Sequence, residues 1–180
     1  IKKTKLKKNE NVLILSNHQT DLDPIIMYLA FNRPIYIVAT DTLMSNGMTS
    51  RFLRHTSSPL PKKKGMSDIQ NVLDMMKVAK EGGNIALFPE GNRTYAEFQF
   101  PIEEATAKLI RKLKLPVLLY NLKGGNGVMP RFFAKRRKGK FTGEVLRRIE
   151  VEEYSKMSDE ELLNLIKENK RPSLFNLPFG

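Results

Sequence analysis

The sequence predicts an α/β fold in a single domain, with a mostly parallel central sheet flanked by helices. Short apolar runs rich in β-branched residues alternate with helical patterns of roughly 10 to 14 residues. Such alternation is typical of βαβ units, in which each helix returns the chain so that successive strands lie parallel. The 180 residues are enough for one domain with a substantial core. We therefore expect one domain over residues 1–180.

The first part of the chain predicts two strands and two helices. Residues 11–16 predict a buried strand because they contain the apolar run Val12-Leu13-Ile14-Leu15, and the helix that follows covers residues 24–31. Residues 35–39 are apolar and largely β-branched, which predicts a second strand. A short helix is expected over 41–53, and the prolines within 57–61 predict a loop.

The middle of the chain predicts two further helix and strand pairs. A helix over 67–81 is indicated by apolar residues at three- and four-residue spacing, namely Ile69, Val72, Leu73, Met76 and Ala79. Residues 84–88 form a short apolar run typical of a central parallel strand. The helix expected over 101–114 has one apolar face, formed by Ala105, Leu109 and Leu113. Residues 116–122 predict the next strand.

The C-terminal part departs from this alternation. Residues 123–127 are rich in glycine and predict a flexible loop. Residues 141–151 predict one strand, or two joined by a hairpin near Gly143. Ser158 and Glu161 form a capping box, which predicts a last helix that continues to about residue 170.

The composition excludes several classes of protein. The chain has no cysteine, which excludes disulfides, thiolate nucleophiles and zinc sites built on cysteine. It has two histidines, His18 and His55, which excludes a histidine-rich metal site. The sequence has neither a Gly-x-Ser-x-Gly elbow nor a phosphate-binding loop, so a serine acyl-enzyme and a nucleotide triphosphatase are both disfavoured. No apolar run reaches about 18 residues, so none of the 180 residues is predicted to form a membrane-spanning helix.

The charge is strongly basic and unevenly distributed. The net charge is +12, from 31 basic and 19 acidic residues. A polyanionic partner is the usual implication: nucleic acid, an anionic membrane surface or a phosphorylated small molecule. The alternative is that each cluster is a solvated face that maintains solubility. The basic clusters lie within residues 2–8, 62–64 and 131–140.

The polar stretch 16–24, between the first strand and the first helix, carries the best candidate for proton transfer. Histidine passes a proton readily near neutral pH, and Asp23 can hold one ring nitrogen of His18 as a donor while the other acts as a base. Five residues along a helix turn through about 500°, so the two side chains meet only if the intervening loop folds back. Alternatively, Asp23 is a helix N-cap followed by Pro24 at the first helical position.

A second polar turn, 88–94, follows the predicted strand 84–88. Gly91 can adopt a positive φ, which allows a tight turn, and Arg93 can present its planar guanidinium to a phosphate. Lys64, after an earlier strand-like run, supplies another cation. Turns that follow parallel strands share one edge of the sheet, so we expect a histidine base to face a basic, phosphate-sized pocket. This constellation suits deprotonation of a hydroxyl on a phosphorylated substrate, with direct attack of that hydroxyl on an activated carbonyl.

Two of these stretches resemble the first and third motifs of the glycerolipid acyltransferases, in particular the 1-acyl-sn-glycerol-3-phosphate acyltransferases. They are Asn17-His18-Gln19-Thr20-Asp21-Leu22-Asp23 and Phe88-Pro89-Glu90-Gly91-Asn92-Arg93-Thr94. Residues 60–65 resemble the second motif of that family, and residues 115–119 a degenerate fourth. The resemblance implies a glycerol-3-phosphate acyltransferase-like fold.

The resemblance also implies roles for these residues. His18 would be the general base on the acceptor hydroxyl, and Asp23 would fix its tautomer and raise its basicity. At position 64 this sequence has lysine, whereas arginine is common in the second motif of the family. The phosphate would therefore contact a single ammonium group rather than a bidentate guanidinium. The residues that would bind the glycerol phosphate are Lys64, Glu90, Gly91 and Arg93.

The implied reaction moves a fatty acyl group from acyl-coenzyme A or acyl-acyl-carrier protein to the free hydroxyl of 1-acyl-sn-glycerol-3-phosphate, giving phosphatidic acid. No metal and no cofactor beyond this cosubstrate is expected. The expected partners are the lysophospholipid acceptor, the acyl donor and an anionic membrane surface, but not nucleic acid. The expected location is the cytoplasmic face of the cell membrane, where the protein would be either peripheral or anchored by a segment preceding Ile1.

Two rival hypotheses remain. A nucleic-acid-binding protein is suggested by the charge alone and leaves the turns of His18 and Arg93 unexplained. The second rival hypothesis is a lipid-binding module that has the same motifs but does not catalyse acyl transfer.

Overall fold

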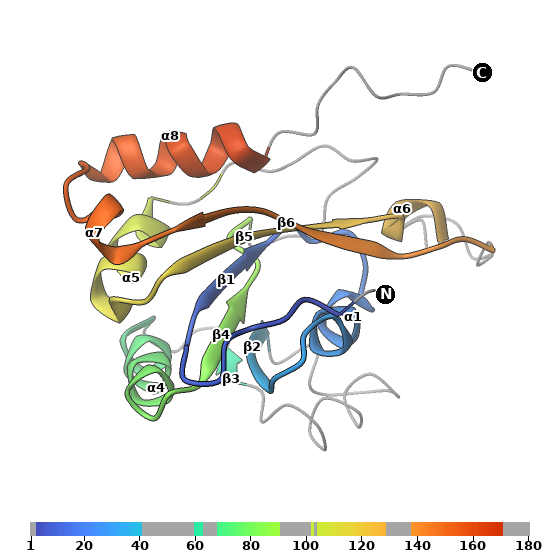
Figure 1. Ribbon diagram of the computed structural model, residues 1–180, viewed down its shortest axis with the longest axis horizontal. Helices are drawn as coiled ribbons and strands as arrows, with labels where there is room; N and C mark the ends of the chain where they lie inside the picture. The colour runs from blue at the N-terminus through green and yellow to red at the C-terminus, as the bar shows by residue number, and fades with distance from the viewer. Residues whose placement is uncertain are drawn as a thin grey trace.

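In the computed structural model, the described residues form one six-stranded sheet in the order β3-β2-β4-β1-β5-β6, with helices around it (Figure 1). The described residues are 3–40, 60–62, 68–90, 102, 104–128 and 138–170. The strands are β1 (Leu13–Ser16), β2 (Ile35–Thr40), β3 (Leu60–Lys62), β4 (Asn84–Leu87), β5 (Val117–Lys123) and β6 (Thr142–Ile149). The helices are α1 (Asp23–Ala30), α4 (Asp68–Lys80), α5 (Ala105–Leu113), α6 (Gly125–Val128), α7 (Val151–Tyr154) and α8 (Asp159–Lys170).

The sheet is parallel except at one edge. Strands β3, β2, β4, β1 and β5 run parallel to their neighbours, whereas β6 runs antiparallel to β5. Strand β1 lies in the interior of the sheet, with Leu15 opposite Leu87 of β4 on one side and opposite Leu119 of β5 on the other. The predicted α/β class with a mostly parallel sheet flanked by helices is therefore confirmed.

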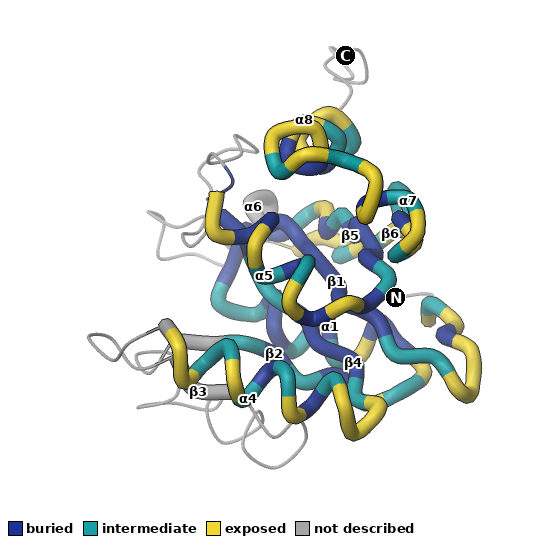
Figure 2. Tube along the Cα trace, turned by 90° about the vertical axis from the view of Figure 1, so that its left-hand side faces the viewer, coloured by how far each residue is buried: buried dark blue, intermediate teal, exposed yellow. Residues whose placement is uncertain are grey.

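Side chains of β1 alternate between two hydrophobic cores. Leu13 and Leu15 belong to the core shared with α4, α5 and α8, whereas Ile14 belongs to the core shared with α1 and the N-terminal segment. Successive side chains of a strand point to opposite faces, so a strand covered on both faces is apolar at every position. This explains the continuous apolar run in the sequence. Figure 2 shows the buried strands at the centre and exposed residues on the outer helices.

Helix α4 forms where the spacing predicted it, but only part of the predicted apolar face is buried. Ile69 and Leu73 are 68% and 51% exposed. Met75 and Val78 lie in the core instead, with Val72, Met76 and Ala79 packed at its margin. The helix carries apolar residues around more than half of its circumference, so the spacing alone could not tell which stripe would face the sheet.

The apolar face predicted for α5 is only partly buried. Leu113 is buried and Leu109 partly buried, but Ala105 is exposed. The buried stripe is centred on Ala107 and Ile110, both of which are 0% exposed. Helix α8 packs against α5 and covers this stripe, which local sequence could not indicate.

The loop predicted over 57–61 was wrong for its last two residues, which belong to β3. Pro61 lies opposite Ala39 of β2, and β2 is the only strand that pairs with β3 within the described part of the sheet. Proline has no N–H to donate, but it is tolerated in a strand that pairs on one side. Residues 57–59 and the helix predicted over 41–53 lie outside the described residues.

The flexible loop predicted over 123–127 was also wrong. Lys123 is the last residue of β5, and the short helix α6 starts at Gly125. Gly124 has a φ of 89°, a conformation that favours glycine, and it allows the strand to turn directly into the helix. A side chain there would collide with the carbonyl oxygen of Lys140.

Residues 142–149 form the single strand β6, so the hairpin considered near Gly143 is wrong. A Cβ at Gly143 would collide with the hydroxyl of Tyr120 on β5, so glycine here makes room for a buried aromatic side chain. The short helix α7 was not predicted.

The capping box before α8 is confirmed. The Ser158 N–H donates to Glu161 Oε2 over 2.6 Å, and the Glu161 N–H donates to Ser158 Oγ over 3.1 Å. The backbone hydrogen bond from Ser158 is the main cause that lowers the pKa of Glu161. None of the helices in the described part of the chain is long and apolar enough to cross a lipid bilayer.

Candidate active site

The loop between β1 and α1 folds back on itself and brings His18 to Asp23. The distance from His18 Nδ1 to Asp23 Oδ2 is 3.0 Å. This is the folded-back loop that the spacing required. Asp23 is the first residue of α1, and the N-cap is Leu22, which makes no side-chain capping bond. The alternative in which Asp23 is the N-cap and Pro24 the first helical residue is therefore wrong.

The Asp23 carboxylate is fully buried and surrounded by donors from its own loop. Besides His18, Oδ2 accepts the backbone N–H groups of Gln19 at 2.5 Å and Thr20 at 2.9 Å. The Thr20 hydroxyl donates to Oδ1 over 2.8 Å. These donors satisfy the buried carboxylate inside the protein, and the backbone of the loop fixes its position. The start of α1 adds the positive end of a helix dipole.

Contacts with Asp23 and Phe88 hold the His18 ring in place. Because Nδ1 faces a carboxylate, the geometry assigns the hydrogen to Nδ1 and the lone pair of the neutral ring to Nε2. One face of the ring stacks on Phe88, with ring centroids 4.4 Å apart and an angle of 22° between the planes. The His18 side chain is 15% exposed, so a small substrate group can reach it.

The stacking of His18 on Phe88 also joins the two polar turns. Phe88 follows β4, which pairs directly with β1, so both turns emerge at the same edge of the sheet. The shared edge that the sequence predicted is thus confirmed for these turns. Phe88 itself was assigned no role from the sequence, although an aromatic residue at the end of an apolar strand was visible there.

The other predicted site residues are only partly described. Glu90 is 4% exposed and lies just beyond β4, at the same edge as His18. Lys64, Gly91 and Arg93 lie outside the described residues. Within the described residues, no group of three or more His, Cys, Asp or Glu side chains is arranged to hold a metal ion.

Three more polar residues of the loop are almost completely buried: Asn17, Gln19 and Thr20 are 5%, 5% and 3% exposed. Sequence reasoning assigned none of them a role. The available signal was their position, because three uncharged polar residues directly after a buried strand must find hydrogen-bond partners inside the protein.

Together, the fold and the site define an α/β protein that brings a histidine–aspartate pair to the carboxyl edge of its sheet. Such a pair can take a proton from a hydroxyl and return it to a leaving group, while the carboxylate stabilises the imidazolium in between. The acyltransferase family model matches residues 1–123. The chain therefore belongs to the acyltransferase family.

Curated relatives agree with this assignment. The chain is 29% identical over 118 residues to the 1-acyl-sn-glycerol-3-phosphate acyltransferase of Borreliella burgdorferi, an alignment that covers 63% of this chain and 47% of that protein. It is 25% identical over 124 residues to a protein of Mycoplasma genitalium named as a probable 1-acyl-sn-glycerol-3-phosphate acyltransferase, covering 66% of this chain and 46% of the relative. The chain thus spans about half the length of the curated relatives it matches.

A solved structure shares the fold. The crystal structure of the 1-acyl-sn-glycerophosphate (LPA) acyltransferase PlsC from Thermotoga maritima superposes with a TM-score of 0.70. The match covers 90% of this chain and 64% of that one, at 21% sequence identity. At this identity the match shows the α/β fold, and the residues of the site must be argued from their own geometry.

Proposed function

We propose that the chain acts as a 1-acyl-sn-glycerol-3-phosphate acyltransferase. It would transfer a fatty acyl group from an acyl thioester to the free hydroxyl of the acceptor, giving phosphatidic acid for phospholipid synthesis. The observation that carries the proposal is the His18–Asp23 pair, 3.0 Å apart and fixed by the buried loop at the edge of the sheet. The names of two curated relatives support the choice of acceptor.

The geometry suits a direct transfer. Nε2 of His18 takes the proton of the acceptor hydroxyl as its oxygen attacks the carbonyl carbon of the thioester. Asp23 stabilises the imidazolium that forms, because its buried charge lies against Nδ1. The tetrahedral intermediate then breaks its C–S bond, and the departing thiolate takes the proton from Nε2. His18 returns to its starting state, and the products are phosphatidic acid and the free thiol.

We assign the acceptor phosphate to the turn after β4 and to the segment after β3. Both strands run parallel to β1 in the same sheet, so both end at the edge where His18 lies. The residues proposed to hold the glycerol phosphate are Lys64, Glu90, Gly91 and Arg93. The acyl donor would be acyl-coenzyme A or acyl-acyl-carrier protein.

The test of the activity is direct. The protein is incubated with 1-acyl-sn-glycerol-3-phosphate and either donor, and phosphatidic acid is measured by mass spectrometry. We expect product with the native chain and almost none with His18→Ala. Binding of the acceptor without product from either donor would instead support a lipid-binding module without turnover.

A substitution at Arg93 tests the acceptor site. Removing the guanidinium in Arg93→Ala should cost a charge-assisted contact of about 1.5 to 3 kcal/mol, seen mainly as a raised KM for the acceptor. Arg93→Lys should raise the acceptor KM less, because lysine keeps the positive charge and loses only the bidentate hydrogen bonding of the guanidinium. The KM for the acyl donor should change little. An equal loss with a 1-acylglycerol acceptor, which has no phosphate, would contradict the assignment.

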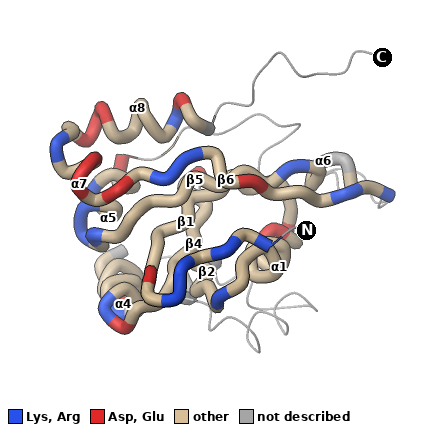
Figure 3. The backbone as a smooth tube through the Cα atoms, in the orientation of Figure 1, with Lys and Arg blue, Asp and Glu red and all other residues tan. Residues whose placement is uncertain are grey.

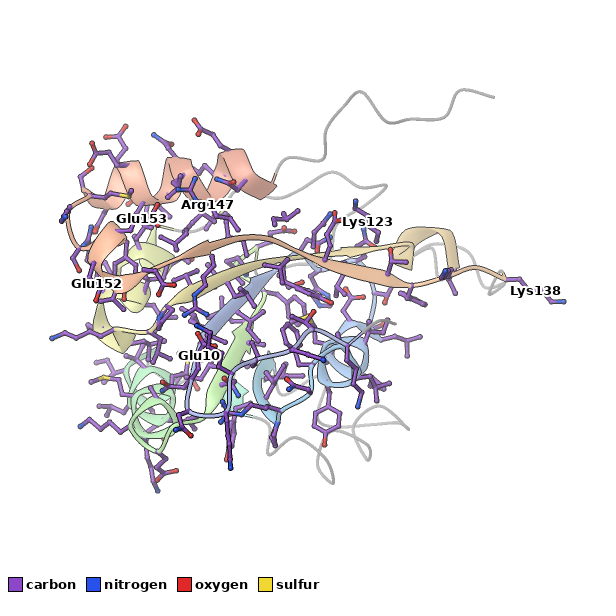
Figure 4. The ribbon with its side chains drawn as sticks, viewed as in Figure 1. Glu10, Lys123, Lys138, Arg147, Glu152 and Glu153 are labelled. Atoms are coloured by element: carbon purple, nitrogen blue, oxygen red, sulfur yellow. The ribbon has the colours of Figure 1, made fainter. Side chains whose placement is uncertain are left out.

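We further propose that the active-site edge meets an anionic membrane surface, at the cytoplasmic face of the cell membrane. Basic residues line the segment before β1 and the end of the ribbon where β6 begins (Figure 3). Lys138 and Lys140 are exposed there, and Lys138 points away from the sheet (Figure 4). Since β6 starts opposite the end of β5, these lysines lie at the carboxyl edge of the parallel strands, on the side of His18.

Liposome binding tests this surface. A lysine close to an anionic membrane contributes about 1 kcal/mol, and salt screens the attraction within a Debye length of about 10 Å at 0.1 M. We expect cosedimentation with anionic but not zwitterionic vesicles, weakening steeply as salt rises. Lys138→Glu with Lys140→Glu should reduce binding more than Lys80→Glu with Lys112→Glu, because these exposed lysines precede β4 and β5 and lie at the opposite edge of the sheet. Undetectable vesicle binding at low salt, with tight sequence-specific binding to nucleic acid, would favour the nucleic-acid hypothesis.

A further inference from the structure

We propose that the junction between β5 and α6, residues Leu122 to Gly125, positions the catalytic loop through the side chains of Asn17 and Gln19. The inference rests on the proposed function of His18 and Asp23, and it adds residues far away in the sequence to that site. Their contacts with Leu122 and Gly125 span 105 and 106 residues of sequence. None of these four residues is proposed to touch the reacting atoms, so they are positioning residues.

Asn17 extends the ladder between β1 and β5 past the point where the backbone of β1 leaves the sheet. The last backbone pair is Ser16 opposite Tyr120. The Asn17 Nδ2 group donates to the Leu122 carbonyl oxygen over 2.9 Å, and the Leu122 N–H donates to Asn17 Oδ1 over 2.7 Å. A carboxamide has the donor and acceptor of a peptide group, so it satisfies both backbone groups of Leu122. The residue before His18 is therefore tied to β5.

Gln19 ties the loop to the start of α6. The Gly125 N–H donates to Gln19 Oε1 over 2.8 Å. A Cβ at Gly125 would lie 2.7 Å from Gln19 Oε1, 2.9 Å from Gln19 Cβ and 3.0 Å from Thr20 Cγ2. The amide oxygen could swing away from such a group, but the Cβ of Gln19 moves only with its own backbone. A side chain at position 125 must therefore displace the loop.

The loop backbone leads directly to the catalytic pair. The Gln19 N–H donates to Asp23 Oδ2 over 2.5 Å, and the same oxygen lies 3.0 Å from His18 Nδ1. Displacing Gln19 removes or bends a bond that holds this carboxylate. The orientation and the tautomer of His18 then change, although no atom of the pair has been substituted.

The competing explanation is that these contacts only stabilise the fold. The chain offers a matched control at the opposite edge of the sheet, where Gly83 precedes β4. A Cβ at Gly83 would lie 2.6 Å from Val78 Cγ1 and 2.9 Å from Tyr36 Cε2, so Gly83→Ala forces a comparable steric shift away from His18. Asn84 similarly matches Asn17: it is 1% exposed and bonds to the backbone of Val12 at 3.3 Å and of Pro34 at 3.1 Å.

The experiment uses the His55→Gln variant as parent, because His18 is then the sole histidine of the chain. Imidazole 15N NMR on this parent reads the tautomer of His18 directly and needs no activity. Gly125→Ala and Gly83→Ala are compared with the parent for the 15N signals, kcat, acceptor KM and Tm. Asn17→Asp and Asn84→Asp form a second pair, in which an oxygen replaces each donor without a change of shape.

We expect Gly125→Ala to shift the His18 signals away from the Nδ1–H tautomer and to lower kcat by about 10- to 10²-fold, since a displacement of about 1 Å can cost 10²-fold. Acceptor KM should change little, and Gly83→Ala should lower Tm without altering the tautomer. Asn17→Asp should likewise shift the His18 signals and lower kcat, whereas Asn84→Asp should lower Tm without altering the tautomer.

Parent-like 15N signals and kcat in folded Gly125→Ala would overturn the proposal, as would an equal change in Gly83→Ala. If the parent shows no acyl transfer, the proposed function fails, and the tautomer comparison alone decides this inference. If Gly125→Ala does not fold, the Asn17 pair decides it.

Discussion

Replacing His18 by alanine is expected to lower kcat by about 10²- to 10⁴-fold, the range typical of a lost general base. The acceptor hydroxyl would then lose the base that we propose takes its proton as it attacks the thioester. The fold should survive, because the side chain is partly exposed and lies at the sheet edge, where it contacts Phe88 and Asp23. Initial rates measured with saturating donor and acceptor check the expectation, with the Tm as a measure of folding.

His55→Ala is the matched control, because it removes the other histidine of the chain. It should retain near-native kcat. Folded His18→Ala protein with near-native activity would contradict the proposed mechanism.

Replacing Asp23 by alanine should lower both activity and stability. The two backbone N–H groups of Gln19 and Thr20 would lose their acceptor inside the protein, at about 1 to 3 kcal/mol for each group left unsatisfied. The tautomer of His18 would no longer be fixed, so kcat should fall by about 10²- to 10⁴-fold. Denaturant unfolding and initial rates measure the two effects separately.

Asp23→Asn separates the charge of this residue from its geometry. The amide oxygen can take the place of Oδ2, and the NH2 group can face the Thr20 hydroxyl, which is able to rotate and accept. The loop should then persist while the imidazolium loses its anion. A charge-assisted bond is worth about 1.5 to 3 kcal/mol, so kcat should fall by about 10- to 10²-fold, less than in Asp23→Ala.

If Asp23 acts through His18, the double variant of His18→Ala and Asp23→Ala should lose no more activity than His18→Ala alone. Additive losses would show that Asp23 has a separate role.

Local sequence was sufficient for the features that depend on neighbouring residues. The apolar run of β1 and the polar turn after it were predictable, because a strand buried on both faces and a strand-to-helix loop each leave a local pattern. The sequence predicted that His18 meets Asp23 only if the loop between them folds back. It gave no evidence that the loop does so. The donors that fold this loop back are the N–H groups of Gln19 and Thr20, which exist in every residue except proline.

Features that depend on distant residues were not predictable. The buried face of α4 is set by the sheet beneath it, and the strand at Pro61 is set by its partner β2. Glycine at position 125 was interpreted as a sign of flexibility, whereas it lies closely packed against Gln19. A contact between residues 106 apart leaves no periodic signal in the sequence.

The interior position of β1 has a consequence for biosynthesis. Its partners β4 and β5 come later in the chain, and Leu13 lies opposite both Ile85 and Val117. At about 5 to 20 residues per second, a ribosome needs on the order of 5 to 20 s to make the roughly 100 residues that separate Leu13 from its second partner. We therefore expect β1 to complete its pairing only after β5 has been made, so that this apolar strand is exposed to non-native contacts during synthesis.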